Sequence, residues 1–373
     1  MRVLQIIDSF RVGGAQKLML TFMEEARAHG LDVTIISLSE FKDGMALAKP
    51  LEELGAQIFL FPGKKLFTLS RLRDITSFVR KNKFSVIHTH LSYANILGGL
   101  VGLVTRTPVV SSLHSTAMDS RHNHFLREQI ELWILRLATK VIGVGKRVAD
   151  IYQTILKRDV IALPNAVAEN NALSADESEA LRTQIGLASA RPTFISVGRL
   201  SSDKGVDDLL TAFVSICETT PNAALLLVGD GESRAELETL AQSLKLDDNV
   251  FWLGMRDDVS QLLAISDIYI SASRREGLPL SLLEAMMAAL PMVVTDVGDV
   301  AQLVGDDAGI LVQHSEPDQL AKAALAVWAM PNHGKMMGEA GLARARRDYG
   351  AEQWFMRLME LYAEITPPAR EQA

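Results

Sequence analysis

The sequence predicts an α/β protein of two doubly wound parallel-sheet (Rossmann-like) domains that face each other across a cleft. Short β-branched runs alternate with longer segments of helical period along the whole chain. At 373 residues, 48% hydrophobic and 22% charged, the chain is too long for one ordinary core and too apolar to be disordered. The alternation pauses after Pro164-Asn165 and restarts after Pro192. We therefore expect an N-terminal domain over residues 1–168 and a C-terminal domain over residues 169–350.

Apolar runs in the first half have the length and composition of strands in a parallel sheet. They are Val3–Ile7, Val33–Leu38, Ile58–Phe61, Val86–His90, Val109–Leu113, Val141–Val144 and Val160–Leu163. Helix-period segments lie between them, at Ala15–His29, Leu69–Lys81, Ala94–Val104 and Phe125–Leu137. This order is typical of parallel strands joined by crossover helices and completes one doubly wound domain.

The second half repeats the pattern after a polar stretch, Glu169 to Ser189, which we expect to cross between the domains. Its expected strands are Thr193–Val197, Ala224–Val228, Val250–Leu253, Ile268–Ser271, Met292–Thr295 and Gly309–Val312. Helical segments such as Val206–Glu218 separate them. An amphipathic helix over Ala351–Ile365 follows and ends before Pro367-Pro368.

The composition favours a cytoplasmic protein. Cys217 is the single cysteine, which excludes an internal disulfide framework and suits a reducing compartment. Asp8 interrupts the first apolar run before a signal-peptide core could form. The weakly polar stretch from Leu91 to Val104 is shorter than the roughly 18 residues that a spanning helix needs.

Charge is distributed unevenly between the halves. Residues 1–170 hold 22 Lys and Arg against 15 Asp and Glu, whereas the remainder holds 16 against 30. Within the basic half, the stretch from Lys64 to Lys83 interleaves cations with apolar residues, a pattern of proteins that sit on anionic lipid. A solvated helix face is the alternative interpretation. We expect no nucleic-acid partner.

The stretch from Ser273 to Met286 carries the clearest sign of a binding site. A loop follows the expected strand Ile268–Ser271, and Pro279 suits the first position of a helix. The backbone N–H groups of Leu280 and Ser281 would then face out of the helix end. Such a helix start is a seat for phosphate.

Two carboxylates, Glu276 and Glu284, bracket this phosphate seat. One carboxylate can accept hydrogen bonds from two adjacent hydroxyls. A phosphate group with polyols on both sides therefore fits the stretch, and a nucleotide sugar is such a molecule.

Glu276, seven intervening residues and Glu284 resemble the signature of the retaining glycosyltransferases of family 4, which have the two-domain GT-B architecture. Other segments match the family in order and spacing along most of the chain. They are Gly13-Gly14-Ala15-Gln16, Pro164-Asn165, Ser196–Leu200, Asp203-Lys204-Gly205, Leu227–Gly231, Leu253-Gly254, Ser266-Asp267 and Gly309–Val312.

The resemblance implies that Glu284 holds the ribose hydroxyls and Glu276 the hydroxyls of the transferred sugar. It also implies that Arg199 and Lys204 neutralise the diphosphate, on which charge builds as the glycosidic bond breaks. Two cations in an otherwise acidic domain would attract such an anion, and an ordinary surface pair is the alternative. The expected donor-binding set is Gly13, Gly14, Arg199, Lys204, Glu276, Gly277, Leu278, Leu280, Ser281 and Glu284.

The pair Gly13-Gly14 lies between an expected strand and helix, where the lack of Cβ atoms lets a ligand approach the backbone. A simple turn is the alternative. Neither this pair nor Gly229-Asp230-Gly231 fits the dinucleotide fingerprint G-x-G-x-x-G, so the sequence argues against a nicotinamide enzyme.

His114 follows the expected strand Val109–Leu113 and resembles the family histidine near the transferred sugar. A structural histidine at the strand end is the alternative. His88 and His90 alternate on one strand, where core hydrogen bonds or a cleft wall are favoured over a metal. The expected catalytic set is Glu276, His114, Arg199 and Lys204, with no metal site and no cofactor.

The sequence hypothesis is transfer of a sugar from a nucleoside diphosphate donor, with UDP slightly preferred, to an acceptor hydroxyl with retention. The resemblance implies that the first half is the acceptor side and the second half the donor side, so the basic charge of the first half favours a glycan or lipid-linked acceptor and a place on the inner face of the membrane. The GT-B resemblance also implies that the helix over 351–366 packs back on the first domain. The alternatives are a nucleotide-sugar epimerase, a noncatalytic nucleotide-sugar-binding protein, or a membrane-associated interaction protein.

Overall fold

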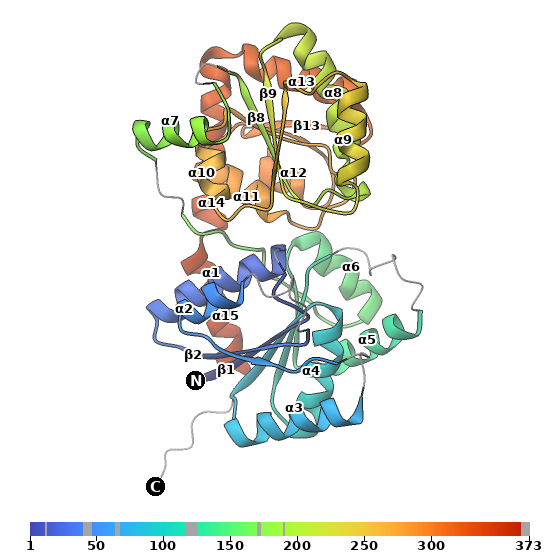
Figure 1. The fold of residues 1–373 in the computed structure, drawn as a ribbon. Coiled ribbons are helices and arrows are strands. Elements are labelled where there is room, and N and C mark those ends of the chain that lie inside the picture. The colour runs from blue at the N-terminus through green and yellow to red at the C-terminus, as the bar shows by residue number, and fades with distance from the viewer. Residues whose placement is uncertain are drawn as a thin grey trace. The chain divides into compact units, whose positions relative to one another are not determined.

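The computed structural model describes residues 1–11, 13–39, 47–63, 68–115, 125–169, 173–188 and 191–366. The chain divides into two compact units, Met1–Ala166 with Ala351–Ala373, and Val167–Gly350. Each unit is a parallel sheet flanked by helices (Figure 1). The expected α/β class and the two Rossmann-like domains are therefore confirmed.

The first unit is built on a seven-stranded parallel sheet in the order β3-β2-β1-β4-β5-β6-β7. The order reverses at β1, which pairs in parallel with both β2 and β4. Its strands are β1 (Arg2–Ile7), β2 (Asp32–Ser37), β3 (Gln57–Leu60), β4 (Val86–His90), β5 (Val109–Leu113), β6 (Lys140–Gly143) and β7 (Ile161–Ala162). Strands β4 and β5 are buried along their whole length, as expected of inner strands.

Helices cover both faces of this sheet (Figure 1). They are α1 (Gly14–Ala28), α2 (Ala48–Glu53), α3 (Leu69–Asn82), α4 (Ser92–Thr105), α5 (Phe125–Leu137), α6 (Lys146–Leu156) and α15 (Ala351–Ile365). The last of these comes from the far end of the chain. Phe22 of α1 meets Trp354 edge-on, with the ring centroids 6.3 Å apart, and Phe355 at 5.5 Å. Aromatic packing of this kind holds α15 on the first unit.

The second unit has a six-stranded parallel sheet in the order β10-β9-β8-β11-β12-β13, which reverses at β8. Its strands are β8 (Thr193–Val197), β9 (Ala224–Val228), β10 (Val250–Gly254), β11 (Ile268–Ser271), β12 (Met292–Thr295) and β13 (Gly309–Val312). Its helices are α7 (Ala175–Gln184), α8 (Val206–Thr219), α9 (Arg234–Ser243), α10 (Val259–Ala264), α11 (Leu280–Met287), α12 (Val300–Val304), α13 (Pro317–Ala329) and α14 (Lys335–Asp348). Two short 3₁₀ turns, η2 (Ser202–Lys204) and η3 (Pro331–Gly334), complete it.

Two expectations change at the level of single segments. The polar stretch after Glu169 contains helix α7, which a capping box starts: the Ser174 N–H donates to the Glu177 carboxylate at 2.8 Å, and the Glu177 N–H donates to the Ser174 hydroxyl. In the basic stretch, Arg71 is buried and donates to the Phe61 carbonyl at 2.7 Å, so it is not a lipid-facing cation. Residues 64–67 of that stretch lie outside the described residues.

No helix in the described ranges is long and apolar enough to cross a membrane.

Helix α14 supports α11 through small residues. Gly338 faces the backbone just after α11, and a Cβ built there would lie 1.8 Å from the Ala289 carbonyl oxygen. Gly341, on the same helix, would place its Cβ no closer than 3.3 Å, from the terminal methyl of Met292. The close approach of the two backbones therefore depends on Gly338.

We expect Gly338→Ala to destabilise the protein although alanine is the better helix former. Overpacking against a backbone atom costs about 2 kcal/mol, which lowers the thermal midpoint of a unit this size by roughly 4 to 8 °C. Gly341→Ala is the matched control and should melt within about 2 °C of the wild type, because the Met292 side chain can move. Equal midpoints for the two variants would contradict the packing described for α14.

Candidate active site

The loop between β11 and α11 places Glu276 beside Lys204. The Glu276 Oε1 atom accepts from Lys204 Nζ at 2.6 Å and from the Ser273 hydroxyl at 2.8 Å. The two charged side chains are only 12% and 22% exposed. Lys204 ends the turn η2 that follows β8, and β8 pairs with β11. The ion pair therefore lies at the carboxyl ends of two adjacent parallel strands, where such sheets bind ligands.

A glycine on the neighbouring chain segment fixes the backbone of Glu276. Gly298 has a φ of +62°, and a Cβ there would lie 2.4 Å from the Glu276 carbonyl oxygen. The next residue, Asp299, donates its N–H to the Gly277 carbonyl at 2.9 Å. A larger residue at 298 would push this segment off the loop that carries Glu276.

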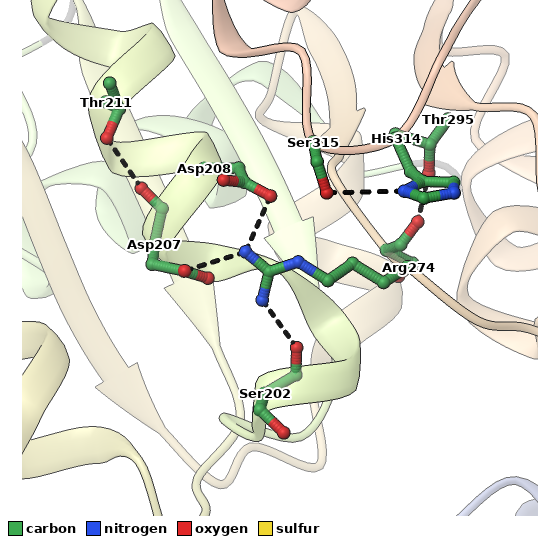
Figure 2. A network of polar contacts seen from close by, with 9 residues as sticks. Ser202, Asp207, Asp208, Thr211, Arg274, Thr295, His314 and Ser315 are labelled. Atoms are coloured by element: carbon green, nitrogen blue, oxygen red, sulfur yellow. Dashed lines mark hydrogen bonds and ion pairs between the residues drawn. The ribbon is translucent and has the colours of Figure 1, made fainter.

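Arg274 ties the same loop to the start of α8 (Figure 2). Its guanidinium contacts one carboxylate oxygen of Asp207 and one of Asp208, each at 2.7 Å, and donates to the Ser202 carbonyl at 2.8 Å. The hydrogen bond to Asp207 is the main cause that raises the pKa of Arg274 above its usual value. These contacts hold the Lys204 turn and the Glu276 loop together.

The start of α11 offers backbone donors rather than side chains. Pro279 is the N-cap, not the first helical residue as the sequence suggested, and its carbonyl accepts from the Leu282 N–H at 3.2 Å. The N–H groups of Leu280 and Ser281 thus precede the helix's own hydrogen bonds. The Leu278 and Leu280 side chains are buried, and the Ser281 hydroxyl lies 3.0 Å from the Tyr269 hydroxyl.

Two other expected donor residues of this unit lie on the elements next to the ion pair. Glu284 lies half-buried on α11. Arg199 is exposed between β8 and η2. Burial acts to raise the pKa of nearby Asp203, but the Ser201 hydroxyl and the Lys204 and Arg199 charges outweigh it and lower that pKa.

A small pocket opens beside Glu276 and its partner Ser273. Its polar lining also includes Ser271 and Thr295, at the carboxyl ends of β11 and β12. The Thr295 hydroxyl donates to the Ser273 carbonyl at 2.5 Å. The rest of the lining is mostly apolar and includes Leu282 and Val297, and the space holds about one water molecule, so the pocket marks hydroxyl groups beside Glu276 rather than room for a sugar.

The first unit holds the remaining expected residues. Gly13 caps α1 in an extended conformation, and a Cβ there would lie 2.7 Å from the Gln16 side-chain oxygen. His114 follows β5, and its Nε2 lies 3.2 Å from Nδ1 of His90. His88 and His90 both make buried side-chain hydrogen bonds, which confirms the expected core role.

Sequence reasoning missed the residues that hold Glu276 in place. Ser273 contacts Glu276 from three residues away on the same loop, Arg274 bonds to residues distant in sequence, and Gly298 acts through its backbone angle. A glycine between Val297 and Asp299 was the available signal for the tight backbone approach. No sequence signal pointed to Arg274, because its partners Asp207 and Asp208 lie on another element.

Within the described ranges, no group of three or more His, Cys, Asp or Glu side chains could hold a metal ion.

Comparison with known proteins matches both units to transferase families. Residues 12–170 match the model described as Glycosyltransferase Family 4, and residues 176–344 match Glycosyl transferases group 1. The UDP-Gal:alpha-D-GlcNAc-diphosphoundecaprenol alpha-1,3-galactosyltransferase of Escherichia coli is 26% identical over 85% of this chain and 85% of its own length. The N-acetyl-alpha-D-glucosaminyl L-malate synthase of Bacillus anthracis is 24% identical over 83% and 81%.

Solved structures share the fold over nearly the whole chain. The Anabaena HepE protein, crystallised in complex with UDP-glucose, superposes with a TM-score of 0.87 at 21% identity and covers 98% of this chain and 100% of its own. WaaG, described as a glycosyltransferase of lipopolysaccharide biosynthesis, gives a TM-score of 0.74 at 17% identity, over 97% and 99%. The two matched domains, in this order and on the GT-B fold, establish that the chain belongs to the family 4 glycosyltransferases, with a group 1 C-terminal domain.

Proposed function

We propose that the protein transfers a sugar from a nucleoside diphosphate sugar to an acceptor hydroxyl with retention of the anomeric configuration. The observation that carries the proposal is the ion pair of Lys204 and Glu276 beside the start of α11. It puts a cation, a carboxylate and the first backbone N–H groups of a helix next to one another. A diphosphate needs the cation and the N–H groups, and a sugar needs the carboxylate.

The diphosphate binds at the start of α11, where it replaces Glu276 as the partner of Lys204. A diphosphate carries more negative charge than one carboxylate and accepts hydrogen bonds from several donors at once. Arg199, exposed and close enough to Asp203 to lower its pKa, supplies the second cation. Released from Lys204, Glu276 is able to accept hydrogen bonds from the hydroxyls of the sugar.

Transfer then proceeds on one face of the sugar. The bond between the anomeric carbon and the diphosphate oxygen breaks, and the acceptor oxygen forms its bond on the same face. The departing phosphate oxygen takes the proton of the acceptor hydroxyl, so no side chain has to serve as the base. Arg199, Lys204 and the α11 N–H groups stabilise the charge that builds on the phosphate.

UDP is the donor nucleotide that the comparisons favour. The Escherichia coli relative is named for a UDP-Gal donor, and HepE was crystallised with UDP-glucose. Two cations beside the diphosphate support transfer without a bound divalent ion or cofactor, since their charge meets that of the leaving group.

The acceptor is a lipid-linked glycan presented at the inner face of the membrane. The Escherichia coli relative is named for a diphosphoundecaprenol-linked acceptor, whereas the Bacillus anthracis relative is named for malate. The two relatives therefore do not agree on an acceptor. A structural feature supports the lipid. Helix α5 exposes a stripe of large apolar side chains to solvent, Phe125, Leu126, Ile130, Trp133 and Leu137, which we call the α5 stripe.

One exposed arginine lies on α5 itself, and another lies on α3, which packs against α4. Arg136 of α5 is exposed and donates to the Ile155 carbonyl at 3.2 Å. Exposed Arg80 donates to the Val104 carbonyl at 3.3 Å, beside the exposed end of α4. An apolar helix face with arginines next to it is the pattern of a helix that lies in the interface of an anionic bilayer.

Separate substitutions of Glu276 and Glu284 should distinguish effects on sugar transfer from effects on UDP binding. We expect Glu276→Gln to lower kcat with a UDP-sugar at least 100-fold, because the sugar loses its charged acceptor (about 2.7 kcal/mol or more). The same variant should bind UDP at least as tightly as the wild type in titration calorimetry, since Lys204 loses a competing carboxylate. Glu284→Gln should weaken UDP binding about tenfold. Unchanged turnover in Glu276→Gln would refute the assignment.

A single incubation tests both the stereochemistry of transfer and its dependence on a metal ion. With an α-linked UDP-sugar, the proton NMR spectrum of the first product should show an α linkage, and the initial rate should be the same in EDTA. A β-linked product would overturn retention. A rate lost in EDTA and restored by Mg²⁺ would instead contradict the role given to Arg199 and Lys204.

Vesicle flotation distinguishes the candidate membrane surfaces. We expect the wild type to float with vesicles rich in phosphatidylglycerol at low salt, and Trp133→Ser with Leu126→Ser to abolish flotation. Leu69→Ser removes an equally exposed leucine from α3, within the basic stretch, and should float normally. If only Leu69→Ser loses flotation, the membrane contact lies on α3 and not on the α5 stripe. If the wild type never floats, the proposed membrane association is wrong.

A further inference from the structure

The two residues of the central ion pair are held by different parts of the chain. Glu276 follows β11, and the Ser273 hydroxyl of the same loop bonds to its carboxylate. Lys204 lies on residues 202–208, which contain the turn η2 and the start of α8 and which we call the 202–208 segment. The lysine has a flexible four-carbon side chain, so the place of its charge depends on how firmly the backbone beneath it is held.

One arginine bonds to the 202–208 segment near both of its ends (Figure 2). The Arg274 guanidinium donates to the Ser202 carbonyl at 2.8 Å and contacts carboxylate oxygens of Asp207 and Asp208 at 2.7 Å each. In the described part of the chain, this guanidinium has no hydrogen bond or ion pair outside the segment. All of its side-chain bonds therefore act on the part of the chain that carries the lysine.

Backbone contacts join the same two parts of the chain. The Arg274 N–H donates to the Asp203 carbonyl at 2.8 Å. Gly205 has a φ of +61°, and a Cβ there would lie 2.1 Å from the Ala272 carbonyl oxygen. The backbone on either side of Lys204 thus lies against the chain that leaves β11. These contacts stop at Gly205, so the guanidinium is the group that reaches the part of the segment within α8.

The charge of Arg274 is neutralised by its partners rather than offered to a ligand. Two carboxylates meet the one guanidinium, whose side chain is 28% exposed. A diphosphate would have to displace both of them to reach Arg274, whereas at Lys204 it displaces one. Arg274 is therefore suited to hold the segment and not to bind the leaving group.

We infer that Arg274 is a positioning residue of the proposed transfer, which fixes the 202–208 segment so that the Lys204 ammonium meets the diphosphate where charge develops. The inference rests on the proposed function, in which Lys204 moves from Glu276 to the diphosphate. It adds that the lysine side chain makes this move alone, while its backbone stays on Arg274. A charge held in place before the reaction stabilises the transition state more than one that must first be ordered.

Hydrogen exchange measures the hold on the 202–208 segment without any substrate. In the Arg274→Met variant, we expect peptides that cover these residues to exchange about tenfold faster than in the wild type, because the guanidinium bonds are lost and local opening becomes easier. Mass spectrometry of the peptides gives the rates.

Arg344→Met is the matched control. The Arg344 guanidinium also bonds to carbonyl and carboxylate groups, namely the Leu303 and Val304 carbonyls and the Asp307 carboxylate. These partners precede β13, at the amino end of the strand and so at the opposite edge of the sheet from Lys204. Arg344→Met should lower the thermal midpoint but leave exchange of the 202–208 segment unchanged.

A double-mutant cycle tests whether Arg274 acts through Lys204. We expect Arg274→Met alone to lower kcat with a UDP-sugar about tenfold, Lys204→Met alone to lower it about 100-fold or more, and Arg344→Met to leave it within about twofold of the wild type. If the arginine acts through the lysine, adding Arg274→Met to Lys204→Met should lower kcat by less than a further factor of about two. A further tenfold loss in the double variant would contradict the inference.

A third variant separates positioning from damage to the fold. Removal of Arg274 alone leaves two carboxylates side by side without their cation, which can destabilise α8. The variant that combines Arg274→Met with Asp207→Asn and Asp208→Asn avoids this charge, so it should melt closer to the wild type. It still lacks the guanidinium, and we expect the same faster exchange and lower kcat. Wild-type exchange and kcat in this variant would mean that Arg274 only balances charge, and the inference would be wrong.

The two measurements distinguish the inference from the proposed function. Faster exchange of the 202–208 segment in Arg274→Met, with no added loss of kcat in the Lys204→Met background, supports the inference. Unchanged exchange overturns it, whatever the activity of the wild type. A wild-type protein that transfers no sugar from any nucleoside diphosphate donor would refute the proposed function, while the exchange rates would still decide whether Arg274 holds the segment.

Discussion

The ion pair between Lys204 and Glu276 is the interaction on which the rest of the site depends. It is partly buried, and a charge pair withdrawn from water is retained at little cost only when further hydrogen bonds satisfy it. Ser273 supplies such a bond to Glu276. A pair held in this way is poised for exchange, because an anion with more charge than a carboxylate can take over the lysine. The fold supplies the geometry by pairing β8 with β11.

The scaffold around this pair allows little freedom. Gly205 and Gly298 have positive φ angles, and a Cβ at either would meet a backbone carbonyl oxygen of the Glu276 loop, 2.1 Å and 2.4 Å away. Arg274 adds an ionic clamp to the start of α8. These contacts fix the backbone of the loop that carries Glu276 and of the turn that carries Lys204. In the first unit, the His114 ring lies 3.2 Å from the His90 ring nitrogen.

Periodicity predicted the strands well and the supporting residues poorly. The expected strands of both halves appear with bounds that are identical or differ by one residue, because buried parallel strands are continuous apolar runs. Glu276 and Glu284 were proposed from their place around an expected helix start, and Arg199 and Lys204 from the family resemblance. The structure places Lys204 against Glu276. The links of Gln5 to His90 and of Arg274 to Asp207 join residues far apart in sequence, so no local pattern reveals them. Arg71 is an error of the opposite kind. Its charge predicted a surface position, but the side chain is buried and donates to the Phe61 carbonyl.

A crystal structure with an intact nucleoside diphosphate sugar, or an unreactive analogue of one, tests the central claim most directly. The measured quantity is the position of Lys204 Nζ. The account predicts that this nitrogen leaves Glu276 and lies within hydrogen-bond distance of a phosphate oxygen at the start of α11, with Glu276 on the sugar hydroxyls. A nucleotide bound elsewhere, or a Lys204 that stays on Glu276 while the donor is bound, would contradict it.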